Sequence, residues 1–251
     1  IKVYLRDIHF MSLSTLFTKP NLYLAWQRII ASKDARYKNF FRPLLESYEL
    51  SINENIRDLR QRMKNNVYVP MHPLRIYKPK SSGLQRPLSL LHIEDQIVLQ
   101  AITNLIAEKT RNRRVALENK YVFSNKLGKT KTPFFLEDWR FGYSLQRKII
   151  QQKFSQGYVW VVKTDLSSFY DTIPHDLLLK YLAPRQSSDL YKKALQWLGV
   201  WSSGQKSTQH KHGIPQGPMA SDFLAETILL NVDEKMSQNY QYFRYVDDVI
   251  L

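Results

Sequence analysis

Apolar side chains recur every three or four residues in two stretches of the first half of the chain, as on one face of an α-helix. The positions are Leu22, Trp26, Ile29 and Ile30 in the first stretch and Val98, Ala101, Ile102, Leu105 and Ile106 in the second. We therefore predict a helix over 21–30, after a break at Pro20, and another over 94–106. Packing into a core explains both apolar faces.

A strand pattern lies between these two helices, with apolar residues at Val67, Val69, Leu74 and Ile76. Residues 81–83, Ser-Ser-Gly, are typical of a turn. We therefore predict a β-hairpin with lysine and arginine residues on both arms. The basic run that follows the second helix, 109–114, is most simply interpreted as a solvated helix face.

Short, nearly continuous apolar runs replace the helical spacing after residue 157. The first run, 158–165, predicts a buried strand that ends in the carboxylate of Asp165. The last run, 242–251, predicts a second strand that contains two adjacent carboxylates, Asp247 and Asp248. Both strands therefore carry aspartates.

Two helices are predicted between these strands. The first starts near Pro174, a residue suited to a first helical turn, and ends at Pro184. The second follows a Gly/Pro loop at 213–218. Its apolar residues fall at every fourth position, namely Leu224, Ile228, Val232 and Met236.

The aspartates are the candidate catalytic residues. Asp247 and Asp248 stand beside an apolar segment in which bare charges would be costly to bury, although a surface turn explains such a pair when it stands alone. If the two strands are neighbours in one sheet, Asp165 joins the pair and three carboxylates share one edge. Oxygen ligands without histidine or cysteine favour Mg²⁺ or Mn²⁺ over zinc. Two such ions about 3.5–4 Å apart can activate a hydroxyl and stabilise a leaving pyrophosphate.

Composition and charge extend this interpretation. The chain has 251 residues, of which 43% are hydrophobic, enough for a large core in one domain or two interleaved ones. The 37 Lys and Arg against 22 Asp and Glu give a net charge of +15, which favours a nucleic acid as partner and nucleotidyl transfer as the chemistry. No stretch approaches the ~20 apolar residues of a membrane span, so no membrane partner is expected.

The ends of the chain and its lack of cysteine carry two further expectations. Without cysteine, disulfides and thiolate metal sites are excluded, which fits a reducing cytoplasm. The chain starts at Ile1 and ends within the last predicted strand, so we expect it to be part of a longer protein.

Three segments in order, KTDLSSFYDTIPH, HGIPQGPMASDFLAE and YVDD, resemble the A, B and C motifs of reverse transcriptases. The upstream segment YKPKSSGLQRPLSLLHIEDQIVLQAI resembles the fingers motifs of the bacterial and group II intron enzymes of that family. The resemblance covers about 65–251. It implies an α+β fold with the right-hand polymerase architecture, in which 1–155 form the fingers with an N-terminal helical extension. Residues 156–251 then form an incomplete palm with an antiparallel sheet, and no thumb is expected in this chain.

The resemblance also implies a role for each residue that matches a motif. The catalytic aspartates are Asp165, Asp247 and Asp248, which together with the carbonyl of Leu166 hold the metal. The nucleotide-binding residues are Lys80, Arg86, Leu166, Tyr170 and Gln216, and the template and primer lie against Gly213, Pro215 and Gly217. Lys80 and Arg86 grip the triphosphate, and Tyr170 excludes a ribose 2′-hydroxyl by its bulk.

The implied activity is RNA-directed DNA synthesis with two Mg²⁺ ions, Mn²⁺ being the alternative, on an RNA template with dNTPs as substrates and DNA as product. A noncoding RNA or a protein as a further partner stays open, as does the oligomeric state. Group II intron enzymes have other residues at the places of Pro218, Asp222 and Glu226. The segment 123–145 is instead similar to abortive-infection and other defence-associated enzymes, which favours a role in antiviral defence.

Two alternatives stay open at this point. The first is a template-independent or protein-primed DNA polymerase of the same family, which would use the same carboxylates. The second is a nucleic-acid-binding scaffold without catalytic activity. The intact aspartates disfavour the scaffold, because it has no need to tolerate their mutual repulsion.

Overall fold

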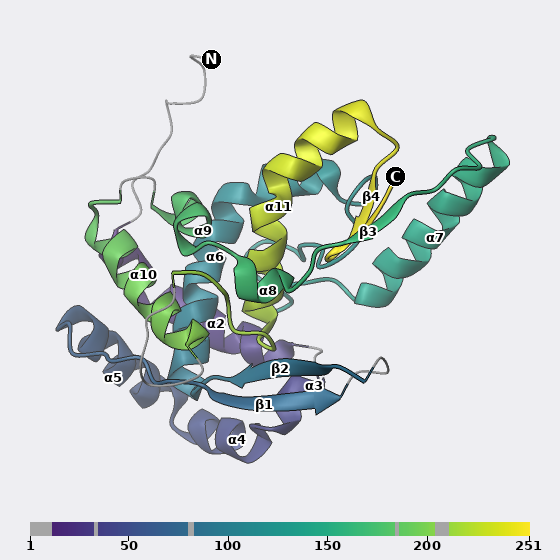
Figure 1. Ribbon diagram of the computed structural model, residues 1–251. Coiled ribbons are helices and arrows are strands. Elements are labelled where there is room, and N and C mark those ends of the chain that lie inside the picture. The colour runs from purple at the N-terminus through teal and green to yellow at the C-terminus, as the bar shows by residue number, and fades with distance from the viewer. Residues whose placement is uncertain (1–11, 33–34, 80–82, 184–185, 204–210) are drawn as a thin grey trace.

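The computed structural model describes residues 12–251 except 33–34, 80–82, 184–185 and 204–210. Within these residues, a body of helices carries two small antiparallel sheets, one at the bottom and one at the right of the view in Figure 1. The helices are α1 (Leu13–Leu16), α2 (Lys19–Ala31), α3 (Ala35–Asn39), α4 (Arg42–Leu50), α5 (Ile52–Lys64), α6 (Ile93–Leu117), α7 (Trp139–Ser155), α8 (Phe169–Thr172), α9 (His175–Leu182), α10 (Asp189–Ser202) and α11 (Met219–Asn239). The strands are β1 (Leu74–Pro79), β2 (Gln85–Leu90), β3 (Lys163–Asp165), β4 (Phe243–Tyr245) and β5 (Asp248–Ile250). The predicted α+β class with antiparallel strands is confirmed at this level.

Helix α6 is the centre of the core. It packs against α2, α9 and α11 and is buried on nearly every face of its N-terminal two thirds. The predicted helices over 21–30 and 94–106 are confirmed as parts of α2 and α6. Pro20 lies inside the first turn of α2 rather than before it, a position where the missing N–H costs nothing.

Strands β1 and β2 form the predicted hairpin, with Leu74 opposite Leu90 and Pro79 opposite Gln85. The prediction that Val67 and Val69 belong to a strand is wrong, because both lie outside β1 and are exposed. The prolines at 70 and 73 explain the difference, since proline has no N–H to donate to a strand ladder.

The prediction of a buried strand over 158–165 is also wrong. Strand β3 comprises only the last three residues of the run, extended by two backbone hydrogen bonds between Val162 and Leu251, and all residues of the run are exposed, with Trp160 92% accessible. Strand β3 is the edge of a three-stranded sheet of order β3-β5-β4. A continuous apolar run is typical of a strand covered on both faces, and no described element covers β3 in that way.

None of the helices in the described part of the chain is long and apolar enough to cross a lipid bilayer. The three-stranded sheet lies between α11 and α7, and α7 extends away from the body of the molecule (Figure 1).

Candidate active site

A tight hairpin at the end of the three-stranded sheet presents one aspartate. Strands β4 and β5 are joined by two residues, Val246 and Asp247, with Tyr245 opposite Asp248. Val246 has φ of +56°, in the left-handed region. A β-branched residue avoids this region, and such a conformation costs about 1–3 kcal/mol. The turn is therefore strained immediately before Asp247.

Strand pairing brings Asp165 to the same end of the sheet. Strand β3 runs antiparallel to β5 with Asp165 directly opposite Asp248. The N–H of Leu166 donates a hydrogen bond to the carbonyl of Asp247 at 3.2 Å. Asp165 and Asp247, which are 82 positions apart in the sequence, thus become neighbours through backbone contacts alone.

The carboxylates affect one another electrostatically. Burial raises the pKa of Asp247, and the charges of Asp165 and Asp248 raise it further, while Arg86 of β2 acts in the opposite direction. The Nζ of Lys163 pairs with Asp248 at 3.1 Å. Asp247 therefore lies in a crowded anionic environment that a bound cation would relieve.

In the described part of the chain, no three histidine, aspartate or glutamate side chains come together in a way that could hold a metal ion. The full predicted ligand set, in which Asp165, Asp247 and Asp248 act together, is thus not assembled, and Asp248 is paired with Lys163 instead. The smaller set of Asp165, Asp247 and the Leu166 carbonyl fits a divalent cation, because it combines hard oxygen donors with unrelieved carboxylate repulsion.

Tyr170 is fixed by a residue of α11. Its hydroxyl donates to Oδ1 of Asp222 at 2.8 Å, and its ring meets the edge of Phe169 at a centroid distance of 6.0 Å. Burial and the nearby Asp222 carboxylate raise the pKa of Tyr170 well above its usual value. The phenol is therefore neutral and held in one orientation.

The loop before α11 is held in place on both sides. Gly213 has φ of +90°, and its carbonyl accepts a hydrogen bond from Ser202 Oγ at 2.6 Å. The carbonyl of Gln216 accepts from the N–H of Ser89 in β2 at 2.8 Å, and Pro215 between them is buried. The loop thus ties the β1–β2 hairpin to the helix that follows.

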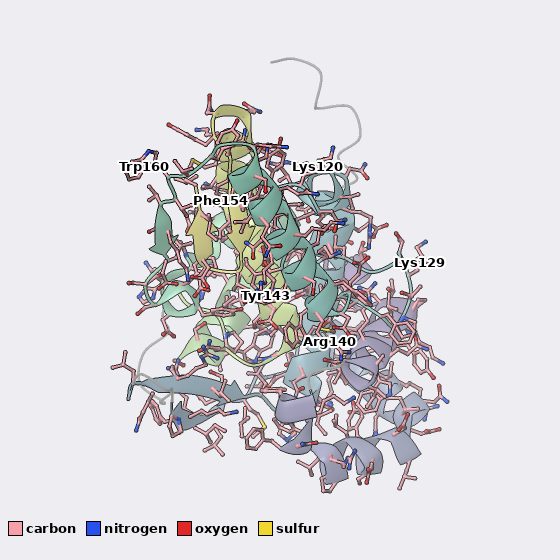
Figure 2. All side chains as sticks on the ribbon, turned by 90° about the vertical axis from the view of Figure 1, so that its right-hand side faces the viewer. Lys120, Lys129, Arg140, Tyr143, Phe154 and Trp160 are labelled. Atoms are coloured by element: carbon pink, nitrogen blue, oxygen red, sulfur yellow. The ribbon has the colours of Figure 1, made fainter. Side chains whose placement is uncertain are left out.

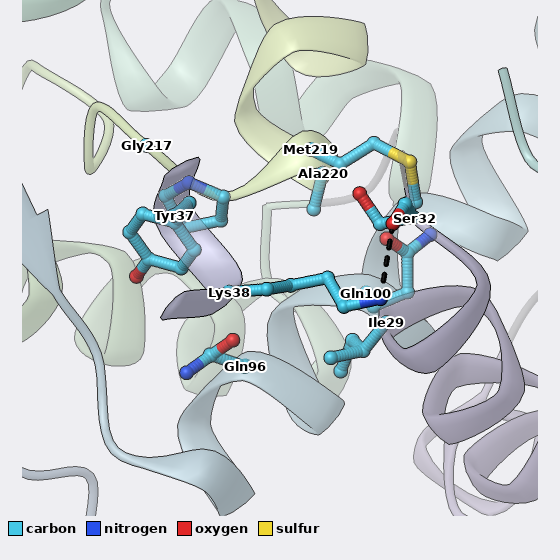
Figure 3. Close-up of a pocket in the computed structure, with 10 residues that line it drawn as sticks. Ile29, Ser32, Tyr37, Lys38, Gln96, Gln100, Gly217, Met219 and Ala220 are labelled. Carbon is cyan, nitrogen blue, oxygen red and sulfur yellow. Dashed lines mark hydrogen bonds between the residues drawn. The ribbon is translucent and has the colours of Figure 1, made fainter. Parts of the chain in front are cut away.

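Gly217 is required by packing. It has φ of +131°, and a Cβ at this position would come within 2.5 Å of the Tyr37 ring. Figure 3 shows this ring beside Gly217, with the Lys38 amine 3.1 Å from the carbonyl oxygen of Ser32. The cavity beside them has about 20 Å³, room for one water molecule. Tyr37 thus makes a close approach to Gly217, and the contact of Gly217 with template and primer stays a prediction.

Lys80 and Arg86 are the two predicted triphosphate-binding residues. Lys80 lies outside the described residues. Arg86 is exposed on β2 opposite Lys78, within electrostatic range of Asp247.

A buried network of charged side chains, Arg114, Glu226, Asp233 and Arg244, was missed by sequence reasoning. Each of these residues is at most 1% exposed. The interpretation of 109–114 as a solvated basic face is therefore wrong at Arg114, which pairs with Glu226 of α11 at 3.1 Å. A signal was present, because Arg114 continues the i, i+4 row of the core face of α6 through Ile106 and Thr110.

Helix α7 and the run that follows it, 139–163, form a basic and aromatic surface (Figure 2). This segment contains no acidic residue. Its exposed aromatic residues are Trp139, Phe141, Tyr143, Phe154, Tyr158 and Trp160. Tyr143 packs on Tyr245 of the aspartate hairpin with a centroid distance of 5.6 Å, so the surface begins beside the carboxylates. Aromatic rings interleaved with Lys and Arg are typical of single-stranded nucleic-acid binding.

Comparison with known proteins agrees with the motif resemblance. Residues 76–251 match the family "Reverse transcriptase (RNA-dependent DNA polymerase)". This match covers most of the chain. The chain belongs to the reverse transcriptase family.

Several curated proteins are similar to the chain. Protein YkfC of Escherichia coli (strain K12) is 26% identical over 204 residues, which cover 72% of this chain and 45% of that protein. The putative COX1/OXI3 intron 2 protein of Saccharomyces cerevisiae is 26% identical over 226 residues, covering 88% of this chain and 24% of that protein. The retron Ec83 reverse transcriptase of Escherichia coli is 30% identical over 107 residues, covering 39% of this chain and 33% of that protein. The chain thus spans less than half the length of these relatives.

Proposed function

We propose that this protein is an RNA-directed DNA polymerase that adds deoxynucleotides to a growing 3′ end. The observation that carries the proposal is the pairing of β3 with β5, which sets Asp165 opposite Asp248 and next to Asp247. Family membership makes nucleic acid and dNTPs the expected substrates. Primer extension on an RNA template with labelled dNTPs and Mg²⁺ tests the proposal, and a protein that incorporates no nucleotide would refute it.

Asp165, Asp247 and the Leu166 carbonyl would hold the divalent cations, two Mg²⁺ ions or Mn²⁺ in their place. When bound, these ions activate the primer hydroxyl and stabilise the leaving pyrophosphate. Arg86 would bind the triphosphate through its planar fork of donors, together with Lys80. Its position near Asp247 supports this role, because the phosphates must lie beside the carboxylates during transfer.

We further propose that 1–155 form the fingers and 156–251 the palm of a right-hand polymerase. In support, Arg86 and the aspartates lie on two separate sheets. The loop that carries Gly213, Pro215 and Gly217 bridges them through the Ser89–Gln216 hydrogen bond. This location supports the proposed contacts of the loop with template and primer and of Gln216 with the nascent base pair.

The basic and aromatic surface of 139–163 is a candidate path for the nucleic acid. Arg147 and Lys148 are both exposed there, and neither has an ion pair with any described residue. Phosphate groups would therefore meet unpaired cations, and bases would meet exposed rings.

A role in antiviral defence stays a prediction that rests on the resemblance of 123–145. A template-independent or protein-primed polymerase would use the same aspartates, and the identity of the product distinguishes it. The pairing of β3 with β5, which puts carboxylates at one end of the sheet, disfavours a scaffold without activity.

Replacing Tyr170 by alanine is expected to lower the preference for dNTPs over rNTPs by about 100-fold or more. A rigid wall penalises a clashing hydroxyl by more than the ~1–3 kcal/mol of a missing methylene. Incorporation of the two sugars, measured side by side with a melting curve, checks this result.

The matched control is Tyr170→Phe, which keeps the ring and removes only the hydrogen bond to Asp222. It should keep the sugar preference. If Tyr170→Ala folds stably and its preference is unchanged, Tyr170 is a core aromatic and does not select the sugar.

Arg86→Ala and the double variant Arg147→Gln/Lys148→Gln should separate nucleotide binding from nucleic-acid binding. Loss of a charge-assisted hydrogen bond of about 1.5–3 kcal/mol should raise the dNTP KM of Arg86→Ala about 10- to 100-fold. Loss of two phosphate contacts should reduce the salt dependence of single-strand binding by about 1.4 in log–log slope. Steady-state kinetics and binding titrations at several salt concentrations measure both effects.

Each variant is the control for the other. An Arg86→Ala protein whose dNTP KM is unchanged and whose salt slope falls would show that Arg86 contacts a nucleic-acid backbone. An unchanged slope in the double variant would remove the 139–163 surface from the proposed path.

A further inference from the structure

The strained residue before Asp247 has both of its backbone groups held by buried side chains. The N–H of Val246 donates to Ser124 Oγ at 2.7 Å. Its carbonyl accepts from Nη1 of Arg244 at 2.7 Å. A residue stays in the left-handed conformation only when its surroundings over-determine that conformation, and these two contacts do so from opposite sides.

The two holding side chains meet at one carboxylate. Ser124 donates its hydroxyl hydrogen to Oε1 of Glu226, and Arg244 pairs with Oε2 of Glu226 at 2.7 Å. A serine hydroxyl has a single hydrogen. Because that hydrogen points at Glu226, a lone pair of Ser124 Oγ is left to accept the Val246 N–H.

Glu226 is 1% exposed and yet charged. Burial opposes its ionisation, but the pKa of Glu226 is lowered by the charges of Arg244 and Arg114, assisted by the Ser124 hydrogen bond. Asn125 also donates to Oε1 at 3.1 Å. Glu226 is therefore a fixed acceptor rather than a group that titrates near neutrality.

The backbone around Ser124 is anchored as well. The N–H of Phe123 donates to the carbonyl of Arg244 at 3.0 Å, and the N–H of Arg244 donates to the carbonyl of Tyr121 at 2.8 Å. The segment that carries Ser124 thus lies alongside β4 and cannot move away from the turn without breaking these bonds.

We infer that Ser124, Glu226 and Arg244 form a clamp that holds Val246 in its left-handed conformation and so positions Asp247 toward Asp165. The clamp is buried behind the turn, so its members act through Asp247 and are positioning residues. The inference rests on the proposed function, in which Asp247 is catalytic.

Ser124→Ala removes the acceptor of the Val246 N–H and tests the clamp. We expect kcat for dNTP incorporation to fall about 10- to 100-fold, as for other groups that orient a metal ligand, with the dNTP KM unchanged. Amide hydrogen exchange in 243–251 should accelerate by at least about tenfold, the equivalent of about 1.4 kcal/mol for the lost hydrogen bond. Unchanged kcat and unchanged exchange would overturn the clamp.

Val246→Gly in the Ser124→Ala background separates positioning from general packing. Glycine adopts positive φ without strain. The left-handed conformation at residue 246 then depends less on the Ser124 hydrogen bond, and kcat should recover by several-fold. If Ser124 only fills the core, the added glycine cannot raise kcat, and the absence of recovery would overturn the clamp.

Ser221→Ala is the matched control, because Ser221 is a buried serine of α11 whose Oγ has no hydrogen-bond partner among the described residues. It should keep the wild-type kcat and exchange, and a loss equal to that of Ser124→Ala would overturn the clamp. Hydrogen exchange reports on the turn without any activity. A wild-type protein that incorporates no dNTP would thus refute the proposed function, while the exchange difference between the two serine variants still decides whether the clamp exists.

Discussion

Asp247→Asn is expected to lower dNTP incorporation by at least about a thousandfold while the protein stays folded. The substitution keeps the side-chain volume and removes the charge that would bind the cation. Loss of several kcal/mol of transition-state stabilisation corresponds to a factor of this size. Like-charge repulsion with Asp165 and Asp248 is relieved at the same time, so the melting temperature should be equal or higher.

Single-turnover incorporation and a melting curve on the same preparation measure both quantities. Asp248→Asn is the variant with which the loss of incorporation is compared. Its carboxylate is paired with Lys163 and half exposed, so we expect a smaller loss than for Asp247→Asn. Incorporation at the wild-type rate by Asp247→Asn would contradict the assignment of this aspartate.

Arg244→Met is expected to lower the free energy of unfolding by about 3–5 kcal/mol, because removal of one partner leaves an uncompensated buried charge. Arg244 donates to both carboxylate oxygens of Asp233, at 2.7 and 2.6 Å, and pairs with Glu226 as well. All three side chains are almost completely buried. Denaturant unfolding measures the loss, and Asp233→Asn in the same background should restore part of it.

Arg113→Met is the matched control, since Arg113 pairs with Glu234, the residue next to Asp233 on α11. This pair is more than a third exposed on both sides, and exposed pairs contribute only about 0–1 kcal/mol. If Arg113→Met and Arg244→Met lower the free energy of unfolding equally, burial of the charges does not determine how much the Arg244 network contributes to stability.

Periodicity predicted helices α2 and α6, because their apolar residues follow a helical spacing and are buried in the core. The β1–β2 hairpin was predicted from its turn residues and apolar positions, although no residue of β1 is buried. Helix α7 was not predicted, although Phe141, Leu145 and Ile149 recur at every fourth position; in the structure only Gly142 and Gln146 of this helix are buried. The run 158–165 was misjudged because its apolar residues predict burial, whereas the position of β3 at a sheet edge depends on tertiary structure that a local pattern does not contain.

The aspartates of the candidate site could be found from sequence because charges in apolar runs are unusual. The contacts that hold them could not be found in this way. Ser124 and Glu226 are separated by 102 positions, and the hydrogen bond between them, like the one from Val246 to Ser124, forms only when distant segments of the chain pack together. The tie between Tyr170 and Asp222 likewise joins α8 to α11, and nothing in the spacing of the two residues predicts it.

Sequencing of the product made by the protein on an RNA template of mixed sequence, with Mg²⁺ and all four dNTPs, tests the proposed function most directly. We expect DNA that is complementary to the template, made by the wild-type protein and absent with Asp165→Asn and Asp247→Asn. DNA of a sequence unrelated to the template would contradict RNA-directed synthesis and identify an untemplated polymerase. An equal yield of product from the two aspartate variants would contradict the active site itself.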